Sequence, residues 1–165
     1  MNGPPPVGHW LSRLRVSFAP ASVILGTVVD KKPILIHWNN RQRRHRLNLA
    51  FFRNRVKRAL RRLPAERQRR LPEELGIILV SARESGRLHD THLSDPSPAD
   101  VLAFPHGEIV VCPEVAALRH KAHRLTLREE LLTYILHGIL HLAGYRDSTR
   151  AGALTMRRLQ ARLRR

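Results

Sequence analysis

Cysteine is almost absent from this sequence, and its scarcity limits which structural classes and which cellular compartments are expected for the protein. The one cysteine among 165 residues, Cys112, has no partner for an internal disulfide, which excludes a disulfide-stapled secreted domain. No apolar run approaches the roughly 20 residues that a membrane-spanning helix needs. We therefore expect a protein of the reducing cytoplasm, without a membrane as a partner.

Acidic and aromatic residues are scarce as well. Thirteen Asp and Glu stand against 30 Lys and Arg, which gives a formal net charge of +17 at pH 7. A surface of that sign attracts polyanions, and nucleic acid is the most common of these. Because most of the basic residues are arginines, the bias of a GC-rich, arginine-preferring genome is the alternative explanation. Aromatic residues make up only 5% of the chain, so few side chains can stack on nucleic-acid bases.

Length and composition predict one domain. A chain of 165 residues that is 42% hydrophobic can bury one sizeable core, and this composition argues against intrinsic disorder. The first part of the chain has a proline run at its head, and no small-residue cleavage site follows its apolar stretch. We interpret residues 1–32 as an N-terminal extension of low order, with an over-called translation start as the alternative, and residues 33–165 as the domain.

Hydrophobic periodicity predicts a small sheet. Ile34, Ile36 and Trp38 alternate onto one face and predict a first strand, and a nearly all-apolar run predicts a buried central strand. Two further short runs flank a Pro-His-Gly turn and indicate a hairpin. The expected strands are 33–39, 75–82, 101–104 and 108–112.

Helical periodicity and capping residues predict the elements that cover this sheet. Thr126 and Glu129 form a capping box, and Gly144 is typical of the residue after a helix end. The expected helices are 48–63, 113–123, 126–143 and 149–163, whereas the polar stretch 83–98 reads as a loop with one helical turn at most. The order indicates an α+β fold: a single domain with a small mixed sheet of about four strands covered by helices, and a metal site at the end of a helix.

The helix expected at 48–63 has one apolar and one basic face. It lies in the densest basic block of the chain, where thirteen Lys and Arg between residues 41 and 70 accompany a single acidic residue, Glu66. Such a face can hold a nucleic-acid backbone without reading its sequence. The candidate RNA-binding residues are Arg53, Lys57, Arg58 and Arg61.

The chemistry of the chain is concentrated at the end of the helix expected at 126–143. His137 and His141 are four residues apart, so their imidazoles project from one helical face and can reach one metal ion. Gly144 then ends the helix, and Asp147 follows at the distance where a third ligand is expected. Two imidazoles and one carboxylate leave one position of a tetrahedral zinc ion open, as in catalytic sites, where bound water becomes acidic enough to yield a nucleophile. Two core histidines on a helix that ends in glycine are the alternative.

The same spacing occurs in metzincin proteases, but one position argues against a protease. The residue after the first histidine is there a glutamate that serves as general base, and this chain has Gly138. Glycine cannot transfer a proton, so proteolysis is the weaker interpretation. We expect Gly138 to clear room over the metal for a bulky substrate.

Two blocks of sequence resemble the YbeY-type rRNA-maturation endoribonucleases. The run from His137 to Tyr145 is similar to the family pattern His-Gly-x-Leu-His-Leu-x-Gly-Tyr, and the run from Pro98 to Pro105 is similar to Pro-Thr-Asp-Val-Leu-Ser-Phe-Pro. The resemblance extends from about Pro33 to the C-terminus. It implies a bacterial cytoplasmic protein that binds one zinc ion, needs no small-molecule cofactor and cleaves single-stranded RNA. It also implies a role in 16S rRNA 3′-end maturation and ribosome quality control, with rRNA and the ribosome as partners.

The chain departs from this family pattern at four positions. Asp147 replaces a histidine as the third ligand, which should make the bound water less acidic and admit other divalent ions. Leu93 stands where some members carry an arginine implicated in catalysis, and Ala99 and Ala103 lack the hydroxyls of the family block. A catalytically weakened RNA- or ribosome-binding factor that keeps its zinc is therefore the alternative to an active nuclease.

The remaining catalytic roles stay open at the level of sequence. Asp100 and Glu108 are candidates for the general base, but hydrogen bonding at strand ends explains them equally well. Tyr145, beside the metal site, serves either to stack on RNA or to fill the core.

Overall fold

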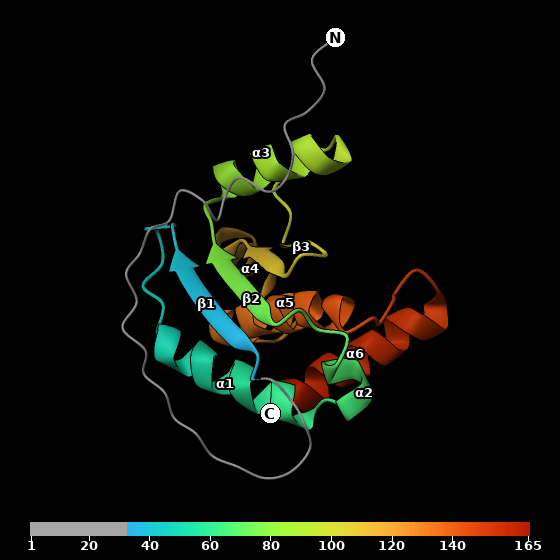
Figure 1. Ribbon diagram of the computed structural model, residues 1–165. Helices are drawn as coiled ribbons and strands as arrows, with labels where there is room; N and C mark the ends of the chain where they lie inside the picture. Colours follow the sequence, from blue (N-terminus) through green and yellow to red (C-terminus); the bar gives the residue numbers. More distant parts are fainter. Residues whose placement is uncertain (1–32) are drawn as a thin grey trace. The chain divides into compact units, whose positions relative to one another are not determined.

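Alternating apolar residues build a four-stranded sheet in the computed structural model, which describes residues 33–165 (Figure 1). The predictions made for residues 1–32 lie outside these residues. The strands run in the order β1-β2-β4-β3, and β3 is antiparallel to its neighbour whereas the other pairs are parallel. This order confirms the predicted mixed sheet and the hairpin of its last two strands. The strands are β1 (Leu35–Asn40), β2 (Glu74–Leu79), β3 (Val101–Ala103) and β4 (Glu108–Val111).

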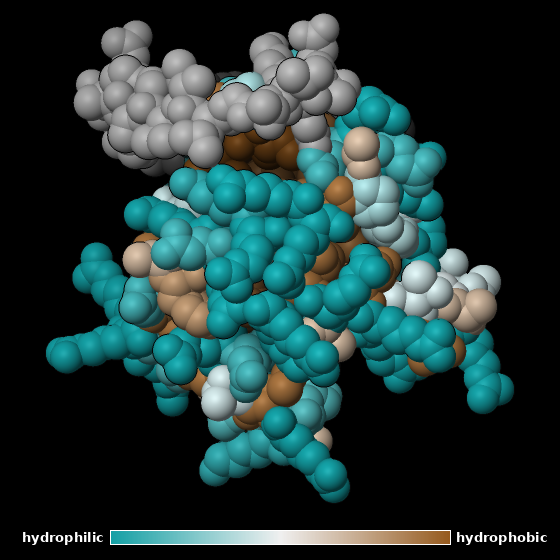
Figure 2. Space-filling model, turned by 90° about the horizontal axis from the view of Figure 1, so that it is seen from below, coloured by the Kyte–Doolittle hydropathy of each residue, from teal (hydrophilic) through white to brown (hydrophobic). Residues whose placement is uncertain are grey.

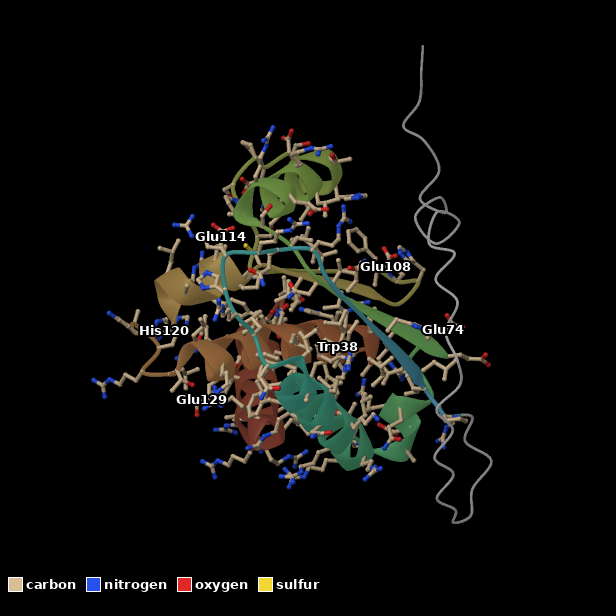
Figure 3. All side chains as sticks on the ribbon, turned by 90° about the vertical axis from the view of Figure 1, so that its left-hand side faces the viewer. Trp38, Glu74, Glu108, Glu114, His120 and Glu129 are labelled. Carbon is tan, nitrogen blue, oxygen red and sulfur yellow. The ribbon has the colours of Figure 1, made fainter. Side chains whose placement is uncertain are left out.

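Helices cover both faces of this sheet. Figure 1 shows α5 across one face with α1 and α6 beyond it, and α3 on the opposite side. The main core lies between the sheet and the helices α1, α5 and α6, and Trp38 points from β1 toward it (Figure 3). The helices are α1 (Leu49–Arg62), α2 (Ala65–Gln68), α3 (Ala82–Leu93), α4 (Pro113–Arg119), α5 (Leu127–Leu142) and α6 (Arg150–Arg164).

One prediction about the helices is wrong: residues 83–98 are not mainly a loop. The helix α3 runs for 12 residues from its N-cap Ser81, whose side chain accepts a hydrogen bond from the amide of Glu84. The polar sequence hid this helix because part of its inner face packs on backbone. Ser85 is buried and donates to the carbonyl of Ala99 at 2.8 Å, and a β-carbon on Gly86 would lie 2.6 Å from a carbonyl oxygen. The helix α4 also ends earlier than predicted, and the single-turn α2 was not predicted.

The helix α5 is the centre of the fold. The predicted capping box is present at its start, where Thr126 and Glu129 exchange hydrogen bonds. Its apolar side chains are buried nearly all around the helix, so α5 is packed from several sides rather than along one stripe. None of the helices in residues 33–165 is long and apolar enough to cross a membrane.

Gly138 serves the packing of α5, and our expectation that it clears room over the metal is wrong. A β-carbon at this position would lie 2.6 Å from Cγ2 of Ile109 and 3.3 Å from Cγ2 of Val101. Ile109 is fully buried and β-branched, so its methyl group cannot move aside easily. Gly138 therefore allows α5 to approach β3 and β4 closely.

We predict that Gly138→Ala destabilises the protein. Overpacking a core costs about 1–3 kcal/mol, whereas exchanging glycine for alanine in a helix gains at most about 1 kcal/mol. The urea midpoint of unfolding should fall. The matched control is Gly76→Ala in β2, where the nearest atom to the new methyl group is Cγ of Glu108 at 3.6 Å. An unchanged midpoint for Gly138→Ala would contradict the packing role.

Candidate metal centre

The last turns of α5 place two imidazoles side by side. His137 and His141 are one turn apart, and their Nε2 atoms lie 2.9 Å from each other. Both side chains are 25% exposed, so the pair lies at the boundary between the core and solvent. This position follows from the burial of the helix around them, which leaves only the histidine face open.

A tight turn after α5 brings the third side chain back to this pair. Gly144 has a φ of 84°, a conformation that side chains disfavour. Its amide donates to the carbonyl of His141, and the amide of Tyr145 donates to the carbonyl of Leu140. This is the Schellman arrangement of a helix end. The reversed chain then places the Asp147 carboxylate 3.5 Å from Nε2 of His137 and 3.7 Å from Nε2 of His141.

These three side chains fit a zinc ion. Their ligand atoms all lie within 4.8 Å of one another. Zinc bonds of about 2.0–2.1 Å in tetrahedral geometry separate neighbouring ligand atoms by roughly 3.3 Å, close to the spacings observed here. Asp147 is 39% exposed, so the side of the triad that it borders faces solvent. Two nitrogens and one oxygen with an open side are the donor set of a catalytic zinc site.

Burial keeps one of these imidazoles neutral. The pKa of His137 is lowered chiefly by desolvation and next by the neighbouring His141, whereas the charge of Asp147 acts in the opposite direction. A lowered pKa means that the ring loses its proton at a lower pH, and only the neutral ring offers a lone pair to a metal. The burial of His137 therefore favours metal binding at neutral pH.

An arginine from outside α5 holds the turn that carries Asp147. Nη1 of Arg67 donates to the carbonyl of Gly144 at 3.1 Å, and its guanidinium lies 4.4 Å from the centre of the Tyr145 ring. The Tyr145 ring packs against the main core as well. These contacts favour the interpretation that Tyr145 fills the core rather than stacks on RNA. They also bring the positive charge of Arg67 next to the turn that carries Asp147.

The two candidate general bases are held by other partners. Asp100 accepts from the amide of Val101 at 2.8 Å and lies 3.8 Å from Arg119. Glu108 pairs with His106 at 3.1 Å, at the end of the sheet where Glu74 begins β2 (Figure 3). Asp100 nevertheless contributes to the electrostatics of the site, since its charge raises the pKa of His137. Strand-end bonding thus accounts for Glu108, and Asp100 is the carboxylate whose charge reaches the triad.

The predicted RNA-binding side chains are exposed. The face seen in Figure 2, from below in the view of Figure 1, is largely hydrophilic. The helix α1 contributes exposed basic residues to the surface of the domain, and α6, which packs beside it, has four exposed arginines. Within residues 33–165, no hydrogen bond or ion pair joins the triad to Arg53, Lys57, Arg58 or Arg61.

Apart from Asp147, the departures from the family pattern lie on the other side of the sheet or at its edge. Leu93 is 64% exposed at the end of α3. Ala99 is half-buried and packs with the small apolar cluster between the sheet and α3, and Ala103 is half-buried in β3. None of the three offers a polar group to the triad.

Comparison with known proteins identifies the family. A family profile described as Endoribonuclease YbeY matches residues 37–165. The chain belongs to the YbeY family. A relative from Kineococcus radiotolerans, named endoribonuclease YbeY, is 35% identical over 107 residues, which cover 54% of this chain and 62% of the relative. A relative of the same name from Thermotoga neapolitana is 40% identical over 74 residues, 42% of this chain and 50% of the relative.

Two further comparisons extend over more of the domain. A YbeY relative from Protochlamydia amoebophila is 29% identical over 140 residues, which cover 78% of this chain and 90% of the relative. The solution structure of a Thermotoga maritima protein has a TM-score of 0.58 and 26% identity, and covers 79% of this chain and 87% of that protein. Membership of the YbeY family and its fold are therefore confirmed, although the matches to the Kineococcus and Thermotoga neapolitana relatives span less than two thirds of their length.

Sequence reasoning missed two residues of the centre, Arg67 and Gln160. The amide nitrogen Nε2 of Gln160 lies 3.0 Å from Nδ1 of His137. A signal for Gln160 was available, because it is a polar residue on the row that Met156 and Leu163 define on α6. No comparable signal existed for Arg67, which is one of many arginines in its segment.

We predict that His141→Ala abolishes zinc binding. Asp147→Ala should lower the zinc affinity by more than the roughly 10–100-fold that is typical when a residue hydrogen-bonded to a ligand, rather than a ligand itself, is replaced. Each substitution removes one ligand atom from the triad. Calorimetric titration of the metal-free protein with zinc would measure both effects. Glu108→Gln is the control, since this carboxylate belongs to no ligand cluster within residues 33–165 and its loss should leave the affinity unchanged. Equal affinity of Asp147→Ala and the wild type would remove Asp147 from the ligand set.

Proposed function

We propose that the protein is a metal-dependent endoribonuclease that hydrolyses single-stranded RNA and acts in 16S rRNA 3′-end maturation and ribosome quality control. The observation that carries this proposal is the convergence of His137, His141 and Asp147 in a chain of the YbeY family. The names of the relatives, endoribonuclease YbeY, support the reaction class. The resemblance described above supports zinc as the ion, the ribosome as the partner and the cytoplasm as the compartment.

The triad would hold the ion and leave its solvent side to the substrate. A bound zinc ion would supply a Lewis acid for the phosphodiester and lower the pKa of coordinated water. The partial exposure of His137 and His141 keeps the open side accessible to a flexible strand. A single strand bends into such a site more easily than a duplex, which is consistent with a single-stranded substrate.

Basic side chains near the triad and on α1 would bind the RNA backbone. Arg67 lies against Gly144, and Nη1 of Arg70 lies 2.8 Å from where a β-carbon on Gly144 would be. These two arginines bring positive charge to the loop that carries Asp147. The exposed Arg53, Lys57, Arg58 and Arg61 on α1 extend this charge along the surface and would contribute affinity without sequence choice.

With Asp147 as the third ligand, the metal preference of this chain should differ from that of a site with three histidines. An aspartate is harder than an imidazole and adds a negative charge to the ligand set. We propose that the centre accepts other divalent ions besides zinc and that coordinated water is less acidic than beside three imidazoles.

A ribosome- or RNA-binding factor that keeps its metal but does not cleave is the second candidate. The observation that favours it is the absence of polar groups at Leu93, Ala99 and Ala103, where family members offer an arginine and two hydroxyls. A small metalloprotease is disfavoured, because a glutamate in place of Gly138 would collide with the buried Ile109.

We predict that the purified protein cleaves single-stranded RNA, that a chelator stops the reaction, and that zinc restores it. A labelled RNA with one single-stranded segment and one duplex segment would report both activity and strand preference. His141→Ala should be inactive because it cannot hold the ion. Binding of RNA without cleavage by the zinc-loaded wild type would favour the non-catalytic factor, and cleavage by His141→Ala would reveal a contaminating nuclease.

We predict that the basic face of α1 contributes to RNA affinity through its charge. Each lost phosphate contact should reduce the slope of log affinity against log salt by about 0.7 for a single strand. Lys57→Ala with Arg61→Ala should therefore flatten the slope by about 1.4. Arg83→Ala in α3, on the opposite side of the sheet, is the control and should leave the slope unchanged. An unchanged slope for the α1 variant would place the RNA elsewhere.

A further inference from the structure

The helix α6 has a polar side chain where its packing calls for an apolar one. The residues that α6 buries are Met156, Gln160 and Leu163, which lie on one face at helical spacing. Gln160 is only 8% exposed. A buried amide that lacks hydrogen bonds destabilises the fold, so this side chain needs partners within the core.

The partner of Gln160 is a candidate metal ligand. Its amide nitrogen, Nε2, lies 3.0 Å from Nδ1 of His137 and 3.4 Å from the carbonyl oxygen of Thr133. The other ring nitrogen of His137, Nε2, faces His141 and Asp147. The imidazole is therefore held at one nitrogen by α6 and offers the other nitrogen to the triad.

The two nitrogens of an imidazole are linked through its tautomer. A neutral ring that offers the lone pair of Nε2 to a metal carries its proton on Nδ1, and this N–H needs an acceptor. A glutamine amide has both a donor and an acceptor end, and a half-turn about its last torsion exchanges them. The half-turn that puts Oε1 in the place of Nε2, 3.0 Å from Nδ1, makes Gln160 the acceptor of this hydrogen bond. The Thr133 carbonyl stays paired, since it also accepts the helical hydrogen bond from the amide of His137.

A second contact holds α6 against α5, at the distance where Gln160 reaches His137. Nη1 of Arg164 donates to Oγ1 of Thr133 at 2.9 Å, one turn further along α6 than Gln160. Leu163 is buried beside it. The amide of Gln160 is thus positioned by a helix anchored to α5 and not by a flexible loop.

We propose that Gln160 is a positioning residue for the metal centre: it accepts the Nδ1–H of His137 and so holds Nε2 as the ligand atom. This inference rests on the proposed metal centre. Gln160 contacts neither the ion nor the substrate and acts only through His137. It also explains why α6 carries an amide within an apolar row.

Two substitutions of similar size separate hydrogen bonding from packing. Gln160→Met keeps the volume of the side chain and removes the acceptor, so zinc affinity should fall about 10–100-fold. Gln160→Glu keeps an acceptor, so it should bind zinc no more weakly than the wild type. Met156→Leu, one turn away on the same buried row, is the control for repacking and should leave the affinity unchanged. Circular dichroism of each variant verifies that it is folded.

A spectroscopic readout tests the tautomer without any activity measurement. In the zinc-loaded protein, nuclear magnetic resonance should show a slowly exchanging Nδ1–H proton on His137 in the wild type and in Gln160→Glu. This proton should exchange too fast to observe in Gln160→Met.

The results distinguish failure of the inference from failure of the metal centre. A wild type that binds no zinc would overturn both. Normal zinc binding by Gln160→Met, or equal weakening in Gln160→Met and Gln160→Glu, would overturn the role of Gln160 and leave the metal centre intact. A loss in Gln160→Met that Gln160→Glu restores, together with the resonance pattern above, would establish it.

Discussion

The close packing of α5 on β3 and β4 is the constraint on which the proposed metal centre depends. Gly138 presents no side chain to Ile109 and Val101, so the helix lies closer to the sheet than any larger residue would allow. This packing fixes the rotation of α5 about its axis. The rotation determines where the imidazoles at positions 137 and 141 point, because both lie within a turn of the glycine. The proposed metal site at the end of this tightly packed helix would thereby be prepared in advance of the ion.

The remaining parts of the centre come from segments that are far apart in sequence. The turn at Gly144 reverses the chain and returns Asp147 to the two histidines, and Arg67 holds that turn from outside. The helix α6, which follows the same turn, supplies Gln160 behind His137. The candidate ligands, the guanidinium that contacts the turn and the amide that contacts the His137 ring therefore all lie near the C-terminal end of α5. Because these contacts act on each other, a change in one is expected to alter the others.

Local patterns predicted much of this arrangement. Alternation predicted the strands, the capping box predicted the start of α5, and the i,i+4 histidines with the later aspartate predicted which side chains meet. The helix α3 was missed because burial of Ser85 and Gly86 against backbone leaves no apolar stripe in the sequence. The role of Gly138 was mistaken because its meaning depends on Ile109, which sequence spacing alone does not place beside it. Gln160 and His137 are 23 residues apart, so their contact depends on tertiary packing.

The most direct test of this account is X-ray absorption at the zinc edge of the zinc-loaded protein. The account predicts a first shell of nitrogen and oxygen at about 2.0–2.1 Å with the outer scattering of two imidazoles and no sulfur. In Asp147→His, the outer scattering should increase to that of three imidazoles. A wild-type spectrum with fewer than two imidazoles, or one that Asp147→His leaves unchanged, would contradict the assignment of His137, His141 and Asp147 as the ligands.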